Sequence, residues 1–247
     1  MDKTQKDLYE QSWATHSLRN PEMWPLHFVI KKLLKKNGKI LEVGPGNWPK
    51  SPVSNTIYLE LTVTGADNLR KIGANASTGS IENIPFKDEI FDIVVALEVI
   101  EHVPNVQQSI SDVKRVLKKR GYFIFSTPIH QNLWTHFDSL AGHLRRFDPI
   151  ELLKIIYKNE FHLIKFIGRK DIPIAFSNIN ALLEERNKKI MMALSEIGIS
   201  ILSRLHHSKL YRMINRQAYD LDLWFSPDLY FDMSKNLGNL TLICQKK

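Results

Sequence analysis

The sequence predicts an α/β fold built on a doubly wound, mostly parallel sheet of about seven strands, with a helical insertion before the last strand. Segments with a strand pattern alternate with segments of helical periodicity, which is typical of a parallel sheet covered by helices on both faces. Residues 91–97 are almost continuously apolar, as expected for a strand buried on both faces. A length of 247 residues without an internal repeat indicates one domain with insertions.

The sequence predicts a helical segment at its start, followed by strands at apolar runs bounded by turn residues. The first 38 residues are expected to form a helical cover, because apolar residues recur at helical spacing from Leu26 until Asn37 and Gly38 end the helix. Strands are then expected at residues 39–43, 56–61, 91–97, 121–126, 161–167 and 240–244.

Two helices are expected between the later strands. Residues 106–119 carry one apolar face and end in basic residues followed by Gly121. Residues 148–158 begin with Asp148 as N-cap and Pro149 at the first helical position.

The composition excludes several classes of protein. An apolar fraction of 43% and a charged fraction of 24% are typical of a globular chain rather than a disordered one. The single cysteine, Cys244, cannot form an intrachain disulfide, and no Cys/His cluster has zinc-finger spacing, which favours a reducing compartment. No apolar stretch resembles a signal peptide or approaches the ~20 residues of a membrane span. A cytoplasmic protein is expected.

The net charge of +8 slightly favours an acidic partner. No RNA-binding module is recognisable, so nucleic acid is not expected as a partner, whereas contact with a membrane surface stays open. The oligomeric state is not predicted.

A glycine loop is the first candidate site. Gly44 and Gly46 directly follow a strand, where a cofactor must approach the backbone closely, and Glu60 ends the next strand, where nucleotide-binding α/β folds present a carboxylate to ribose. A dinucleotide or S-adenosylmethionine could use this geometry.

The residues after the loop separate the two cofactors. Pro49 stands where the dinucleotide fingerprint needs a third glycine, and with Pro52 it leaves little helix to hold a pyrophosphate. S-adenosylmethionine has no phosphate, and its cationic groups gain from a carboxylate such as Glu42. The sequence therefore favours the methyl donor over a nicotinamide cofactor.

Four segments resemble the class I S-adenosylmethionine-dependent methyltransferases, which have a Rossmann-like fold, and in particular their small-molecule, methyltransferase type 11/23-like branch. They are residues 40–46, 79–86, 91–103 and 116–128. The resemblance spans residues 39–167 and the last strand. It implies a single methyltransferase domain over residues 1–247.

The resemblance implies a set of cofactor-binding residues. Trp48 departs from the family pattern at the last glycine of the loop, and Ser80 departs where an aspartate usually accepts from the adenine amino group. A serine hydroxyl can still accept that hydrogen bond. The implied residues are Glu42, Gly44, Pro45, Gly46, Glu60, Leu61, Ser80, Ile81 and Leu97.

Histidines are the candidate catalytic residues. A hydroxyl acceptor must lose its proton, and histidine is the usual base near neutral pH. His102, His130, His136 and His143 all follow strand ends, and His143 is the first choice, with His102 second. The neighbouring Arg145 and Arg146 are expected to grip an acidic group on the acceptor.

The cluster of Glu98, Glu101 and His102 has residue types that suit a divalent metal. It resembles the cluster in metal-dependent ubiquinone-pathway O-methyltransferases and small-RNA 2′-O-methyltransferases. The same pattern is common in members without a metal, so no metal ligand is assigned and activity without added metal is expected.

The sequence thus predicts a methyltransferase for a small-molecule acceptor, with oxygen favoured over nitrogen or carbon. The alternatives are a non-catalytic S-adenosylmethionine-binding subunit and a metal-dependent enzyme for RNA or a quinone-type acceptor. Residues 171–238 carry an apolar helical face with basic residues, and they are expected to form a helical substrate lid.

Overall fold

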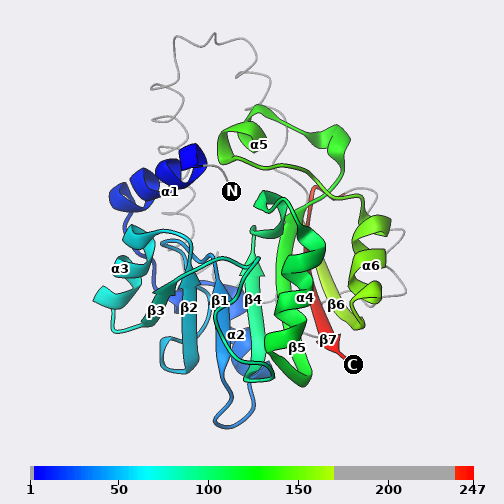
Figure 1. Ribbon diagram of the computed structural model, residues 1–247, viewed down its shortest axis with the longest axis horizontal. Coiled ribbons are helices and arrows are strands. Elements are labelled where there is room, and N and C mark those ends of the chain that lie inside the picture. Colours follow the sequence, from blue (N-terminus) through cyan, green and yellow to red (C-terminus); the bar gives the residue numbers. More distant parts are fainter. Residues whose placement is uncertain (1–2, 170–236) are drawn as a thin grey trace.

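The computed structural model describes residues 3–169 and 237–247. Its centre is a seven-stranded sheet in the order β3-β2-β1-β4-β5-β7-β6 (Figure 1). Strand β7 is antiparallel to both neighbours, and the other neighbouring strands are parallel. The strands are β1 (Ile40–Val43), β2 (Thr56–Glu60), β3 (Asn75–Thr78), β4 (Phe91–Leu97), β5 (Leu117–Pro128), β6 (Phe161–Arg169) and β7 (Asn239–Lys246). The predicted fold class is confirmed.

Within the described residues, helices cover both faces of this sheet and the edge formed by the carboxyl ends of its strands (Figure 1). They are α1 (Lys3–Thr15), α2 (Pro25–Leu33), α3 (Val63–Lys71), α4 (Val106–Val116), α5 (His136–Ala141) and α6 (Pro149–Lys158). Within the described residues, no helix is long and apolar enough to cross a membrane.

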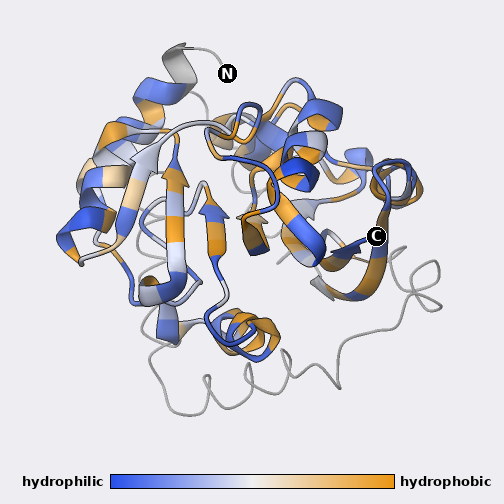
Figure 2. Cartoon of the chain, turned by 60° about the horizontal axis from the view of Figure 1, so that its bottom comes forward, coloured by the Kyte–Doolittle hydropathy of each residue, from blue (hydrophilic) through white to orange (hydrophobic). Residues whose placement is uncertain are grey.

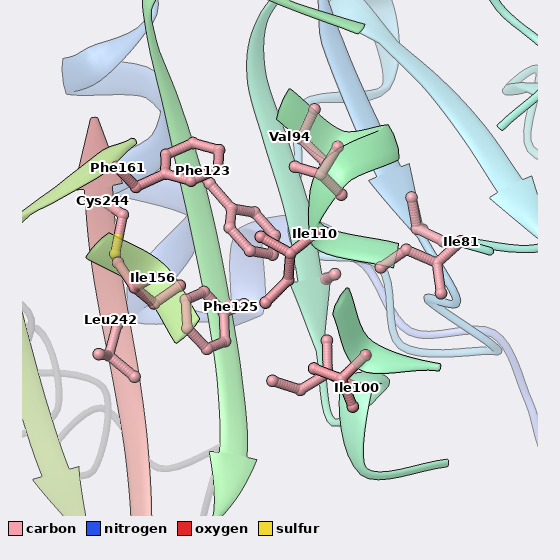
Figure 3. Close-up of a cluster of buried hydrophobic side chains, with 14 of the residues drawn as sticks. Ile81, Val94, Ile100, Ile110, Phe123, Phe125, Ile156, Phe161, Leu242 and Cys244 are labelled. Atoms are coloured by element: carbon pink, nitrogen blue, oxygen red, sulfur yellow. The ribbon is translucent and has the colours of Figure 1, made fainter. Parts of the chain in front are cut away.

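The alternation of side chains along the strands divides the core in two. On one face, residues of α4 and α6 pack on Val94, Phe123 and Phe125, as Figure 3 shows for Ile110 and Ile156. On the other face, α2 packs on alternate strand residues and α3 forms a smaller cluster around the buried Tyr58. The hydropathy colouring shows helices that are polar on one side and apolar on the other (Figure 2).

One predicted helix is too long. The helix predicted for residues 106–119 ends at Val116, and β5 begins at Leu117. Leu117 pairs with Phe91 of β4, and the Lys118 ammonium donates to Asp92 Oδ2 at 2.8 Å. Pairing with a neighbouring strand therefore overrides the helical pattern of this basic segment.

Other elements were not predicted from sequence. The edge strand β3 lacks an apolar alternation, α3 carries few apolar residues, and α5 has only 6 residues. By contrast, α6 begins where predicted, with Asp148 Oδ1 accepting from the N–H groups of Ile150 and Glu151. Apart from Leu237 and Gly238, the predicted insertion at residues 171–238 lies outside the described residues, so the lid stays a prediction.

The strand order fixes where a ligand can bind. From β1 the chain proceeds outward to β2 and β3, and then returns to place β4 on the other side of β1. Ligands of open α/β sheets bind at such a reversal, outside the carboxyl ends of the strands. The loops after β1, β2, β4 and β5 meet at this edge.

Candidate functional site

A cavity of about 670 Å³ lies at this edge of the sheet. Its lining includes every implied cofactor residue except Gly46, and it also includes both His102 and His143. We call Glu42, Gly44, Pro45, Glu60 and Leu61 the loop wall, and Glu98, His102, Ala141 and His143 the histidine wall. The fold therefore brings most of the candidate cofactor-binding residues and both candidate catalytic histidines into one cavity.

The loop wall depends on two glycines with positive φ. Gly44 has φ +63°, and a Cβ there would lie 2.9 Å from Val99 Cγ2. Gly46 has φ +54°, and a Cβ there would overlap the ring of Trp13 on α1. Gly46 is thus covered by α1 instead of facing the cavity, while its N–H donates to Glu60 Oε2 at 2.8 Å.

Two buried carboxylates complete the loop wall. Glu60 Oε1 accepts from the N–H of Leu61 at 2.9 Å, and Glu42 Oε2 accepts from the N–H of Ser51 at 2.8 Å. Burial raises the pKa of both carboxyl groups, and these N–H donors offset part of the rise. Both side chains still contribute to the cavity lining.

These residues fit S-adenosylmethionine. The methionyl part of the cofactor must approach the glycine loop closely. A side chain at Gly44 would overlap Val99, so this position requires glycine. The ribose hydroxyls and cationic groups of the cofactor need acceptors, and Glu60 and Glu42 are the buried carboxylates that line the cavity. Leu61, Ser80, Ile81 and Leu97 also line the cavity, and the Ser80 hydroxyl accepts from the N–H of Glu82 at 3.2 Å.

Helix α1 covers the cavity, and sequence analysis missed its part in the site. Tyr9 and Trp13 line the cavity with their rings stacked 6.1 Å apart, and Trp48 packs edge-on against Trp13 at 5.9 Å. Trp48 therefore replaces the family's last glycine with a side chain that holds α1. The four-residue spacing of the two aromatic side chains in α1 was the available signal.

A close group of three ionisable side chains includes both residues of the histidine pair and a carboxyl group behind them. The rings of His102 and His143 lie 4.7 Å apart, and Glu101 lies behind them with its side chain fully buried. Glu101 Oε1 is 3.9 Å from Nε2 of His102 and 3.9 Å from Nε2 of His143. The backbone N–H of Leu144 donates to the carbonyl of Glu101 at 2.9 Å, which brings the loop after α5 to this position.

His143 is oriented by a carboxylate. Its Nδ1 lies 2.8 Å from Asp138 Oδ1, which also accepts from Arg146 Nε at 2.9 Å. Although burial raises the pKa of Asp138, hydrogen bonds from Arg146, the N–H of Thr135 and His143 lower it to about 2. Asp138 is therefore ionised near neutral pH, and His143 carries its proton on Nδ1.

His102 lies in a different environment. Its Nδ1 is 3.1 Å from the carbonyl oxygen of Gly142 and 3.1 Å from the hydroxyl of Tyr9. Burial and the nearby His143 lower the pKa of His102 to about 4, so its ring is neutral near pH 7. Burial and the charge of Glu98 raise the pKa of Glu101 well above its usual value.

The structure corrects the expected role of the two arginines. Arg146 is buried and binds Asp138 through two nitrogens, with Nη2 3.0 Å from Oδ2. Arg145 donates to the carbonyl of Pro104 at 3.3 Å. Arg146 thus holds the group that orients His143 and does not face an acceptor.

The remaining candidates do not join the group formed by Glu101, His102 and His143. His130 and His136 are not among the described residues that line the cavity. Glu98 does line it, but its carboxylate is held by Ser126 and by Asn239 Nδ2, the latter at 3.0 Å. The structure therefore joins His143, which is distant in sequence, to Glu101 and His102 in place of Glu98.

Comparison with known proteins gives the same assignment. Residues 44–125 match a family model described as a methyltransferase domain. The chain is 30% identical over 215 residues to the uncharacterized protein MJ0638 of Methanocaldococcus jannaschii, covering 76% of this chain and 92% of the relative. It is 29% identical over 129 residues to the phthiotriol/phenolphthiotriol dimycocerosates methyltransferase of Mycobacterium tuberculosis, covering 45% of this chain and 48% of that enzyme.

Solved structures share the fold. The YcgJ protein of Bacillus subtilis superposes with a TM-score of 0.57 at 18% identity, covering 90% of this chain and 98% of that one. An S-adenosylmethionine-dependent methyltransferase of Thermotoga maritima gives a TM-score of 0.56 at 17% identity, covering 97% and 92%. The chain therefore belongs to the class I S-adenosylmethionine-dependent methyltransferases, and S-adenosylmethionine is its cofactor.

Proposed function

We propose that this enzyme methylates a hydroxyl oxygen of a small-molecule acceptor. The observation that carries the proposal is the pair formed by His143 and Asp138 in the histidine wall. This pair leaves Nε2 of His143 as the proton-accepting atom in the same cavity as the loop wall. A hydroxyl acceptor needs such a base, whereas the cofactor supplies an already activated methyl group.

The loop wall would hold the cofactor. Glu60 would accept from the ribose hydroxyls, and Glu42 would help order the methionyl end of the cofactor. Ser80 and Ile81 would contact the adenine, and Leu97 would contact the methionine side chain. Gly44, Pro45 and Gly46 would give the loop its shape, with Gly46 acting through its contact with α1.

Of the two histidines, His143 is the better base. A group with a pKa of about 4, as in His102, is a weak proton acceptor near neutral pH. His143 instead has an ionised carboxylate on Nδ1, which stabilises the imidazolium formed when Nε2 takes a proton. His102 would then position its neighbour and shape the wall.

Aromatic residues would exclude water from the reaction. Tyr9 and Trp13 of α1 and Phe137 of α5 also line the cavity. Exclusion of water strengthens the interaction of His143 with Asp138 and prevents loss of the donor to hydrolysis.

The proposal is tested by locating the transferred methyl group. The purified protein is incubated with isotopically labelled S-adenosylmethionine and a metabolite extract, and the labelled product is isolated and its bond assigned by NMR. Label on an oxygen supports the proposal. Label on a nitrogen or carbon overturns the choice of acceptor atom, and no labelled product overturns the proposal of an active small-molecule methyltransferase.

A further inference from the structure

We propose that Glu101, His102 and His143 form a binding site for one divalent transition-metal ion, open on one side to the cavity. One donor atom from each residue lies within 4.8 Å of the other two. The binding site stands on this geometry alone, whereas its role in catalysis rests on the proposed function.

The first argument is the state of the two imidazole rings. His102 Nδ1 faces the carbonyl oxygen of Gly142, which can only accept, and His143 Nδ1 faces Asp138, a carboxylate paired with Arg146. Both Nδ1 atoms are therefore the protonated ones, and each Nε2 has a free lone pair. A carboxylate or carbonyl on the far nitrogen of a metal-binding histidine is the usual arrangement at metal sites.

The second argument is the unpartnered oxygen of Glu101. Glu101 Oε2 accepts from the hydroxyl of Thr127 at 3.2 Å, but Oε1 is buried without a hydrogen-bond partner. It faces the two Nε2 atoms at 3.9 Å, which is too long for a hydrogen bond. A buried carboxylate oxygen without a partner is costly, and a cation among the three atoms would satisfy it.

The spacing fits a metal ion after small movements. A zinc-like ion lies about 2.0–2.2 Å from nitrogen and carboxylate ligands, which places tetrahedral ligands roughly 3.4 Å from one another. The two distances from Glu101 Oε1, each 3.9 Å, exceed that value by about 0.5 Å, and all three donor atoms lie within 4.8 Å of one another. Binding an ion therefore requires the side chains to rotate toward one another.

The donor set selects the kind of metal. Two imidazoles with one carboxylate are typical of zinc and of other first-row transition metals, whereas Mg²⁺ and Ca²⁺ prefer oxygen ligands. Because His102 and His143 line the cavity, the remaining coordination positions would face an acceptor. An ion there would lower the pKa of a bound hydroxyl, so that the hydroxyl would release its proton to water before methyl transfer and not to Nε2 of His143.

The test uses the full chain without cofactor or acceptor. After treatment with a chelator and dialysis, Co²⁺ is titrated while its visible absorption is recorded, and Zn²⁺ is titrated by calorimetry. We expect one saturable site per chain. Glu101→Gln and His143→Ala should each weaken binding by at least the roughly 10- to 100-fold that loss of an outer-shell partner costs.

His136→Ala is the matched control, since it removes an exposed histidine of the neighbouring helix and should bind Co²⁺ like the wild type. Circular dichroism and S-adenosylhomocysteine binding show whether each variant is folded. If Glu101→Gln does not fold, His143→Ala decides, because its side chain lies on the cavity wall. Absence of saturable Co²⁺ and Zn²⁺ binding, or binding that both variants leave unchanged, overturns the site.

Two further outcomes separate this site from the proposed function. Co²⁺ binding together with methylation of nitrogen supports the metal site and overturns only the hydroxyl acceptor. Oxygen methylation that survives chelation, with no Co²⁺ binding, overturns only the metal site. Binding of Mg²⁺ in place of Co²⁺ contradicts the ligand assignment.

Discussion

The two walls of the cavity differ in how their buried carboxylates are satisfied. In the loop wall, both oxygens of Glu60 accept backbone N–H groups, and Glu42 accepts those of Lys50 and Ser51. Beside the histidine wall, Glu101 keeps one buried oxygen without a hydrogen-bond partner. A buried polar atom without a partner requires an explanation, and a bound ion or a catalytic role is one. The proposed function accordingly assigns cofactor binding to the loop wall and proton removal to the histidine wall.

The largest effect is expected from a change in the histidine wall. His143→Ala removes the atom that promotes deprotonation, as a base or as a metal ligand, and should lower kcat by about 10²- to 10⁴-fold. Initial rates with labelled donor measure it, with His136→Ala as the control. A decrease of only a few-fold in His143→Ala would remove this residue from the chemistry.

A smaller effect is expected where α1 meets the loop wall. Gly46→Ala combines a positive φ, which costs about 1–2 kcal/mol, with overlap of Trp13, which costs about 1–3 kcal/mol in a well-packed contact. In a Trp13→Ala background only the first penalty should remain. Urea unfolding of the four proteins measures both.

Gly73→Ala is the matched control for this cycle. Gly73 also has a positive φ, of +78°, but a Cβ there would meet no atom within 4 Å. Its penalty should therefore equal that of Gly46→Ala in the Trp13→Ala background. An equal penalty for Gly46→Ala with and without Trp13 would show that α1 does not rest on the loop.

The smallest effect is expected away from both walls. Partial burial raises the pKa of the Asp92 carboxyl group. Hydrogen bonds from Lys118 and from the N–H of Lys39 outweigh this effect and hold the pKa below its usual value. A lowered pKa stabilises the fold above the unfolded pKa, and this contribution is lost as the pH falls through the folded pKa. Asp92→Asn should therefore cost about 1 kcal/mol or less at pH 7 and progressively less below about pH 4. Unfolding at several pH values measures this, and a difference that grows on acidification would contradict the assignment.

The two walls also differ in how far the sequence predicts them. The loop wall could be predicted from the sequence because Gly44, Gly46 and Glu60 follow or end predicted strands, and strand ends are local features of the sequence. The approach of His143 to Glu101 could not be predicted from the sequence, because it depends on where the loop after α5 meets the residues that follow β4. Arg146 was assigned to the acceptor because its pairing with Asp138 appears only in the folded chain.

The role of α1 and the start of β5 could not be predicted from the sequence either. Tyr9 and Trp13 lie in a mostly polar helix whose role follows from packing on the loop wall. The basic end of the predicted helix at residues 106–119 became strand because Leu117 pairs with β4. Tertiary contacts decided both cases.

The proposed separation of cofactor binding in one wall from chemistry in the other is tested most directly by calorimetry. The experiment measures S-adenosylhomocysteine binding to the wild type, Glu60→Ala and His143→Ala. Glu60→Ala should weaken binding roughly ten-fold or more, since a hydrogen bond to a charged group contributes about 1.5–3 kcal/mol. His143→Ala should keep the wild-type affinity while losing turnover. Unchanged affinity in Glu60→Ala, or a matching loss in His143→Ala, would contradict the separation of binding from chemistry.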